Sequence, residues 1–222
     1  MEIRTTFRKR LRAIQDELLA MGSTVEKAIK LSVEALKKRD MKLANQIIAD
    51  DKKINEKRFE IEETCIQLIA TQQPMAGDLR TLISVMNIIT ELERIGDHAE
   101  GIAKIVIMIG DEPPLKPLID IPRMAEKTVD MLRRCLDAFM NCDEDTAKAI
   151  AAEDDEVDQL YNQVYRELVS YMVEDPKTIT RATRLLWVAH NLERCADRVT
   201  NICERVVFNV TGKMYEINAS KY

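Results

Sequence analysis

The stretches Leu92-Glu93-Arg94-Ile95-Gly96-Asp97 and Leu192-Glu193-Arg194-Cys195-Ala196-Asp197 are two versions of one hexapeptide, 100 residues apart. A second match precedes each of them, because residues 49–55 correspond to residues 152–158 with an offset of 103. The three-residue difference falls in the loop before each hexapeptide, where an insertion or deletion costs little stability. Self-similarity of this kind is typical of a duplicated structural unit. The pattern therefore predicts that the two halves of the chain share one fold.

Between the prolines, apolar residues recur at spacings of three and four, which is the pattern of amphipathic helices. Asp40 and Asp143 correspond in the two halves, and both are predicted to be helix N-caps. Six helices are expected, over residues 7–38, 40–71, 78–110, 120–141, 143–175 and 180–210. Long antiparallel helices with short connections form bundles. The predicted fold class is all-α, with two tandem three-helix bundles as domains, residues 1–112 and 113–222.

The composition argues against several classes of protein. The formal net charge is −5, which argues against a nucleic-acid-binding protein, since such proteins usually carry a basic excess. No run of about 18 apolar residues occurs, so we expect no membrane-spanning helix. The five cysteines are odd in number and form no Cys-x-x-Cys pair, which predicts free thiols in a reducing compartment.

The repeated hexapeptide carries two carboxylates at helical spacing. Glu93 and Asp97 are four residues apart and therefore project from one face of a helix, as do Glu193 and Asp197. Folding the first hairpin at its loop places Asp97 near Asp51 and Asn55 on the preceding helix. The same arithmetic in the second half brings together three aspartates: Asp154, Asp158 and Asp197.

Clustered carboxylates repel one another unless a cation neutralises them. An oxygen-only cluster suits Mg²⁺, Ca²⁺, Mn²⁺ or iron. Neutralisation within the chain is the alternative, and it would use five basic residues that lie close in sequence: Lys52, Lys53, Arg94, Arg194 and Arg198. Both readings remain open at this point.

No catalytic constellation emerges beside these carboxylates. The Glu-x-x-His motif of ferritin-like di-iron sites is absent, because Ile95 and Trp187 stand three residues before His98 and His190. We interpret both histidines as structural or surface residues, and we expect Trp187 to pack against a neighbouring helix. The sequence therefore predicts a protein that is not an enzyme.

Three segments resemble the PhoU family of phosphate-transport regulators: residues 73–80, residues 92–99 and residues 192–198. The resemblance spans essentially the whole chain. It implies a cytoplasmic, non-enzymatic negative regulator of the phosphate-starvation response. It also implies two partners, the ATPase subunit of a phosphate ABC transporter and a sensor histidine kinase. A homodimer is expected as well.

The resemblance further implies metal binding, with divalent or trivalent ions and iron clusters among the candidates. Carried over by position, the ligands would be Glu93, Asp97, Glu193, Asp197, Asp51, Asp154 and Asn201. Gly101 stands where the first half would need the counterpart of Asn201, so the first site has one ligand fewer. Two alternatives are kept: a metal-dependent hydrolase or oxidase that uses the same carboxylates, and a metal-free helical scaffold.

Overall fold

The computed structural model describes residues 2–214 and 216, which form helices and loops with no β-strand among them. The elements are α1 (Glu2–Lys38), α2 (Met41–Gln72), α3 (Gly77–Ile109), α4 (Asp120–Asn141), α5 (Glu144–Ala152), α6 (Asp154–Glu174), the 3-10 turn η1 (Pro176–Thr178) and α7 (Ile179–Thr211). The all-α prediction is confirmed. No helix in this part of the chain has the length and apolar character needed to cross a bilayer.

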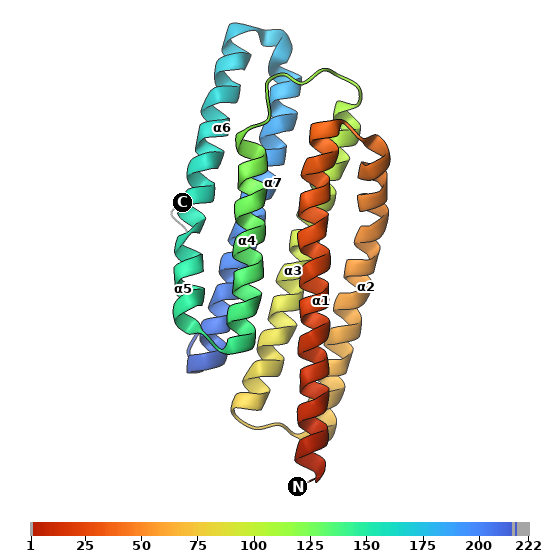
Figure 1. Cartoon of the computed structure of the whole chain (residues 1–222), viewed down its shortest axis with the longest axis vertical. Coiled ribbons are helices and arrows are strands. Elements are labelled where there is room, and N and C mark those ends of the chain that lie inside the picture. The colour runs from red at the N-terminus through yellow and green to blue at the C-terminus, as the bar shows by residue number, and fades with distance from the viewer. Residues whose placement is uncertain (1, 215, 217–222) are drawn as a thin grey trace.

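Two bundles lie side by side with their long axes aligned (Figure 1). One consists of α1–α3, and in the other α4, α5–α6 and α7 take the places of α1, α2 and α3. The inner helices α3 and α7 make the most extensive contact between any two elements. The duplication read from the sequence is therefore a duplication of helices around a central pair.

The predicted N-caps are confirmed. The Asp40 carboxylate accepts hydrogen bonds from the backbone N–H groups of Lys42 and Leu43, and the Asp143 carboxylate accepts one from Thr146. Each satisfies backbone donors that the first turn of a helix leaves free. These caps begin the middle element of each repeat at corresponding positions, and so they set the register of the residues that follow.

The single helix expected over residues 143–175 is interrupted at Glu153, which separates α5 from α6. No glycine or proline marks the break. The Glu153 carboxylate forms ion pairs with Lys127 and Arg134 on α4. The φ and ψ angles of Glu153, −73° and −12°, stay near helical values, so α6 continues roughly in the direction of α5. The interruption makes Asp154 the first residue of α6.

The centre of the molecule is an antiparallel apolar seam between α3 and α7. Leu92, Ile95, Leu192 and Cys195 are fully buried there. The Cys195 thiol lies 3.9 Å from the backbone oxygen of Ile95, so the two hexapeptides meet at the midpoint of the seam. One continuous hydrophobic core runs through both repeats.

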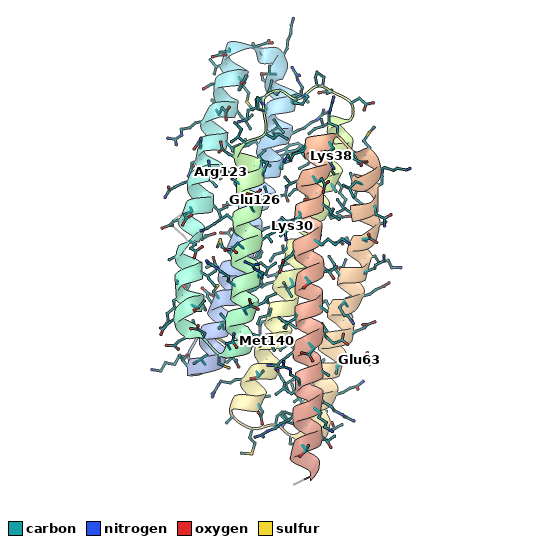
Figure 2. All side chains as sticks on the ribbon, viewed as in Figure 1. Lys30, Lys38, Glu63, Arg123, Glu126 and Met140 are labelled. Atoms are coloured by element: carbon teal, nitrogen blue, oxygen red, sulfur yellow. The ribbon has the colours of Figure 1, made fainter. Side chains whose placement is uncertain are left out.

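On the opposite side of the repeat boundary α1 packs against α4, and charged side chains line the outer edge of this contact. Figure 2 shows Lys30 and Lys38 on α1 and Arg123 and Glu126 on α4, on the two helices nearest the viewer. A groove of about 310 Å³ runs along part of this contact and is lined by Lys30 and Glu126 among others. The repeats therefore meet at two contacts, of which the seam between α3 and α7 is the more extensive.

We predict that the shared core makes the two repeats unfold together. Ile95→Ala truncates a buried side chain of the first repeat, which typically costs about 2–5 kcal/mol. Trp187 is the only tryptophan and reports on the second repeat. Urea titrations followed by circular dichroism and by tryptophan fluorescence should give coincident transitions, and Ile95→Ala should shift both equally.

Ile66→Ala is the matched control, because Ile66 is 52% exposed and its truncation should cost little. A fluorescence transition that stays in place while the circular dichroism transition moves would show that the repeats fold independently.

Candidate functional site

The first carboxylate cluster consists of Asp51 on α2 with Glu93, Asp97 and Glu100 on α3. Asp51 is buried, and its Oδ2 accepts a hydrogen bond of 3.0 Å from the Asn55 side chain. Its Oδ1 is also buried but has no hydrogen-bond partner. Burial raises the pKa of Asp51 to about 6, and the charges of Asp97, Glu100 and Glu93 add to this effect.

Gly96 makes room for this arrangement. A Cβ atom at this position would lie 3.2 Å from Asp51 Oδ1 and 3.1 Å from the Ile54 side chain. On the same helix, burial also raises the pKa of Glu93 and of Asp97. The cluster therefore holds carboxylates that are costly to ionise together.

The second carboxylate cluster consists of Asp154 and Asp158 on α6 with Glu193 and Asp197 on α7. Asp154 is 6% exposed, and its Oδ1 is buried without a hydrogen-bond partner. Burial raises the pKa of Asp154 to about 7, reinforced by Asp197, Asp158 and Glu193. Burial likewise raises the pKa of Glu193 to about 7, reinforced by Asp197 and opposed by Arg194. Arg194 pairs with Asp197 at 2.8 Å.

The residue that precedes each buried aspartate forms an ion pair with a lysine. Asp50 pairs with Lys53 at 2.6 Å, and this contact holds the pKa of Asp50 below its usual value. Glu153, the counterpart of Asp50, pairs with Lys127 at 2.6 Å. A groove of about 290 Å³ between α1 and α2 reaches Asp51 and is also lined by Lys27 and by Lys53, which pairs with Asp50. The charges that shift the pKa of Asp51 and of Asp154 are those of other carboxylates.

This chemistry fits a hard metal ion. The donors are carboxylate oxygens, and Asp51 and Asp154 each keep one buried oxygen that lacks a hydrogen bond. Across residues 2–214 and 216, no three His, Cys, Asp or Glu side chains already converge tightly enough to enclose an ion. Binding would require the carboxylates to move together, which their mutual repulsion opposes until the cation arrives.

The predicted ligands fall into two groups. Electrostatic coupling in each half shows that the α2 or α6 aspartate lies near the hexapeptide carboxylates, as the register arithmetic predicts. The side-chain amide of Asn201 donates a hydrogen bond of 3.1 Å to Glu91 on α3 and is therefore engaged with the other repeat. Its role as a ligand stays a prediction.

Two polar contacts cross the central seam between α3 and α7, and the hydrogen bond between Asn201 and Glu91 is one of them. On one side of the hexapeptides Glu91 meets Asn201, and on the other Asn191 lies 3.0 Å from His98 Nδ1. The space at Gly101 is taken by Asn191, whose Oδ1 would lie 3.1 Å from an added Cβ. Sequence reasoning missed Glu91 and Glu100. Glu100 is three residues after Asp97, a spacing that marks one helix face.

Comparison with known proteins identifies the family of this chain. The family model described as the PhoU domain matches residues 18–106 and again residues 121–206. The chain belongs to the PhoU family. Each matched PhoU domain contains one carboxylate cluster.

Named PhoU relatives cover nearly the whole chain. A phosphate-specific transport system accessory protein PhoU homolog of Clostridium acetobutylicum is 39% identical, over 97% of this chain and 99% of its own length. The accessory protein PhoU of Escherichia coli is 36% identical, over 93% of this chain and 86% of its own length. The crystal structure of the PhoU regulatory protein of Streptococcus pneumoniae superposes with a TM-score of 0.88 at 33% identity, covering 95% of this chain and 99% of that one.

We predict that the buried aspartates lower the stability of the metal-free PhoU chain as the pH rises. An unfolded aspartate has a pKa of about 3.9, whereas Asp51 and Asp154 have values of about 6 and about 7 in the folded protein. Between these values the folded state binds the extra protons, so the free energy of unfolding falls as pH increases, up to about pH 7. Asp51→Asn with Asp154→Asn should remove this loss and stabilise the protein at pH 8 by roughly 1–3 kcal/mol, allowing for partial hydration.

Urea titrations in EDTA at pH 4.5 and pH 8 provide the measurement. Asp50→Asn is the matched control, because the pKa of Asp50 is lowered. Its ionised form is stabilising, so its loss should weaken the fold at pH 8. The account is contradicted if the double variant keeps the pH dependence of the parent.

Proposed function

We propose that this PhoU-family chain is a metal-binding regulatory accessory protein of a phosphate transport system. The names of two relatives support a role in phosphate transport, since the proteins of Clostridium acetobutylicum and Escherichia coli quoted above are accessory proteins of phosphate-specific transport. The observation that carries the metal proposal is the repetition, in both halves, of a buried aspartate with an unpartnered oxygen beside further carboxylates.

In the first repeat Asp51, Glu93 and Asp97 would hold the metal, and in the second repeat Asp154, Glu193 and Asp197 would do so, with Asn201 as a further candidate. A bound cation would supply positive charge among carboxylates that repel one another. The carboxylates would hold it between two helices of one repeat, and so occupancy would change how tightly α2 packs on α3 or α6 on α7. Hard divalent ions and iron both fit an oxygen donor set.

The regulatory part of the proposal has four components. The chain acts in the cytoplasm, as a homodimer, and it represses the phosphate-starvation response when phosphate is plentiful. It does so as an adaptor between the ATPase subunit of a phosphate ABC transporter and a sensor histidine kinase. Nucleic acid is not a partner, in keeping with the net charge of −5. The protein is proposed to be an adaptor and not an enzyme.

The double variant Asp97→Ala with Asp197→Ala tests the metal and its role together. Each substitution removes a carboxylate from one cluster, so protein purified without a metal-affinity tag should lose most of its metal by elemental analysis. Expression of phosphate-uptake genes should then rise during phosphate-rich growth. A metal-free variant that still represses these genes would separate metal binding from signalling.

Asp16→Ala with Asp137→Ala is the matched control, because both aspartates are exposed and lie outside the clusters. Wild-type protein that holds no metal after titration with iron, manganese and magnesium would favour the metal-free scaffold. Turnover in a screen of phosphoester hydrolysis and ferrous oxidation, with metal added, would favour an enzyme.

A further inference from the structure

Four ring-bearing side chains form a strip on the surface of the second repeat. Tyr161 and Tyr165 lie one turn apart on α6, and Trp187 and His190 lie one turn apart on α7. The rings of Tyr161 and His190 are in contact, with centroids 6.2 Å apart. Because α6 and α7 run antiparallel, Tyr165 and Trp187 both lie about one turn from this contact, toward the η1 end of the two helices. We call these four residues the aromatic strip.

The outer half of the aromatic strip is open to solvent. Trp187 is 50% exposed and Tyr165 is 46% exposed. The other half of Trp187 is covered, so the expectation that it packs against a neighbouring helix stays a prediction for that half. Large aromatic side chains left exposed together mark an interaction site more often than scattered apolar residues do.

The inner end of the strip meets the second carboxylate cluster. His190 Nδ1 lies 3.4 Å from Glu193 Oε2, and Asp158 is one turn before Tyr161 on α6. Glu193 Oε2 has no hydrogen-bond partner, and behind it Asp154 is more than nine-tenths buried with an unpartnered Oδ1. Carboxylates beside exposed aromatic faces attract cations through both charge and cation–π contact.

In the first repeat, an arginine of the chain itself lies beside the carboxylate cluster. By the offset of 103, Arg58 corresponds to Tyr161 and Glu62 to Tyr165. The Arg58 guanidinium pairs with Glu62 at 3.3 Å, and its charge opposes the rise in the pKa of Glu93. Each repeat has the arginine of its hexapeptide near the cluster, because Arg94 and Arg194 oppose the rise in the pKa of Glu93 and of Glu193. The first repeat adds a second guanidinium, that of Arg58, where the second repeat has the ring of Tyr161.

We propose that the aromatic strip binds an arginine side chain of a partner protein, in the position that Arg58 takes in the first repeat. The guanidinium would stack on an exposed ring of the strip, that of Tyr165 or of Trp187, and donate a hydrogen bond to the Glu193 carboxylate. Arginine fits better than lysine because its flat, delocalised head stacks on rings while it donates to carboxylates. This inference goes beyond the metal proposal, although the two sites share Glu193, and the titrations below are therefore run both without metal and with it.

Fluorescence of Trp187 gives a direct test, because it is the only tryptophan. The full chain would be titrated with the peptide acetyl-Gly-Arg-Gly-Arg-Gly-amide and with versions that carry citrulline or lysine in place of arginine. Parallel titrations would contain EDTA or Mn²⁺. A saturable change with the arginine peptide in at least one condition is expected, with affinity at least tenfold weaker for citrulline and at least threefold weaker for lysine. No saturation in either condition, or equal binding of either substituted peptide, would overturn the proposal.

Tyr161→Arg installs the first repeat's residue in the second and removes no carboxylate. Its guanidinium should occupy the site from within, weakening binding of the arginine peptide at least tenfold and raising the melting temperature. Gln163→Arg is the matched control, because it adds the same charge at an exposed position of α6 on another face. Peptide binding that is undiminished in Tyr161→Arg would contradict the assigned position.

Discussion

The antiparallel packing of α3 against α7 is the constraint on which the other features of this molecule depend. It buries the apolar residues of both hexapeptides at one crossing, where Ile95 and Cys195 meet. Once those residues face inward, helical periodicity turns the carboxylates of each hexapeptide outward, toward α2 in one repeat and toward α6 in the other. One seam therefore unites the two repeats and also sets the position of both carboxylate clusters.

The position of the clusters carries an energetic cost. Burial raises the carboxyl pKa values, and the charges that act on the two buried aspartates are those of other carboxylates, which raise them further. A protein selected for stability alone would have little reason to keep two such aspartates, since unpaired buried charge is destabilising. The cost is explained if a cation from outside completes each site. The repeats then differ at the edge of the cluster, where Arg58 in the first is matched by Tyr161 in the second.

Much of this arrangement could be predicted from residue spacing. Counting residues outward from the loop between the two helices predicted that Asp51 lies near Asp97, because helix geometry is regular over the distance involved. The break at Glu153 could not be foreseen, since it coincides with ion pairs to a distant helix and not with a local glycine or proline. For the same reason the partner of Asn201 was missed, because Glu91 belongs to the other repeat. The orientation of Trp187 likewise depends on which face of its helix the neighbours leave open.

The central claim is that both carboxylate clusters are cation sites, and anomalous X-ray scattering from crystals of the full chain soaked in Mn²⁺ tests it most directly. The account predicts manganese peaks in both repeats, one between Asp51 and Asp97 and one between Asp154 and Glu193. Peaks confined to other surfaces, or no peak in either cluster at saturating Mn²⁺, would contradict it. In that case the raised carboxyl pKa values would reflect a cost of packing that no metal offsets.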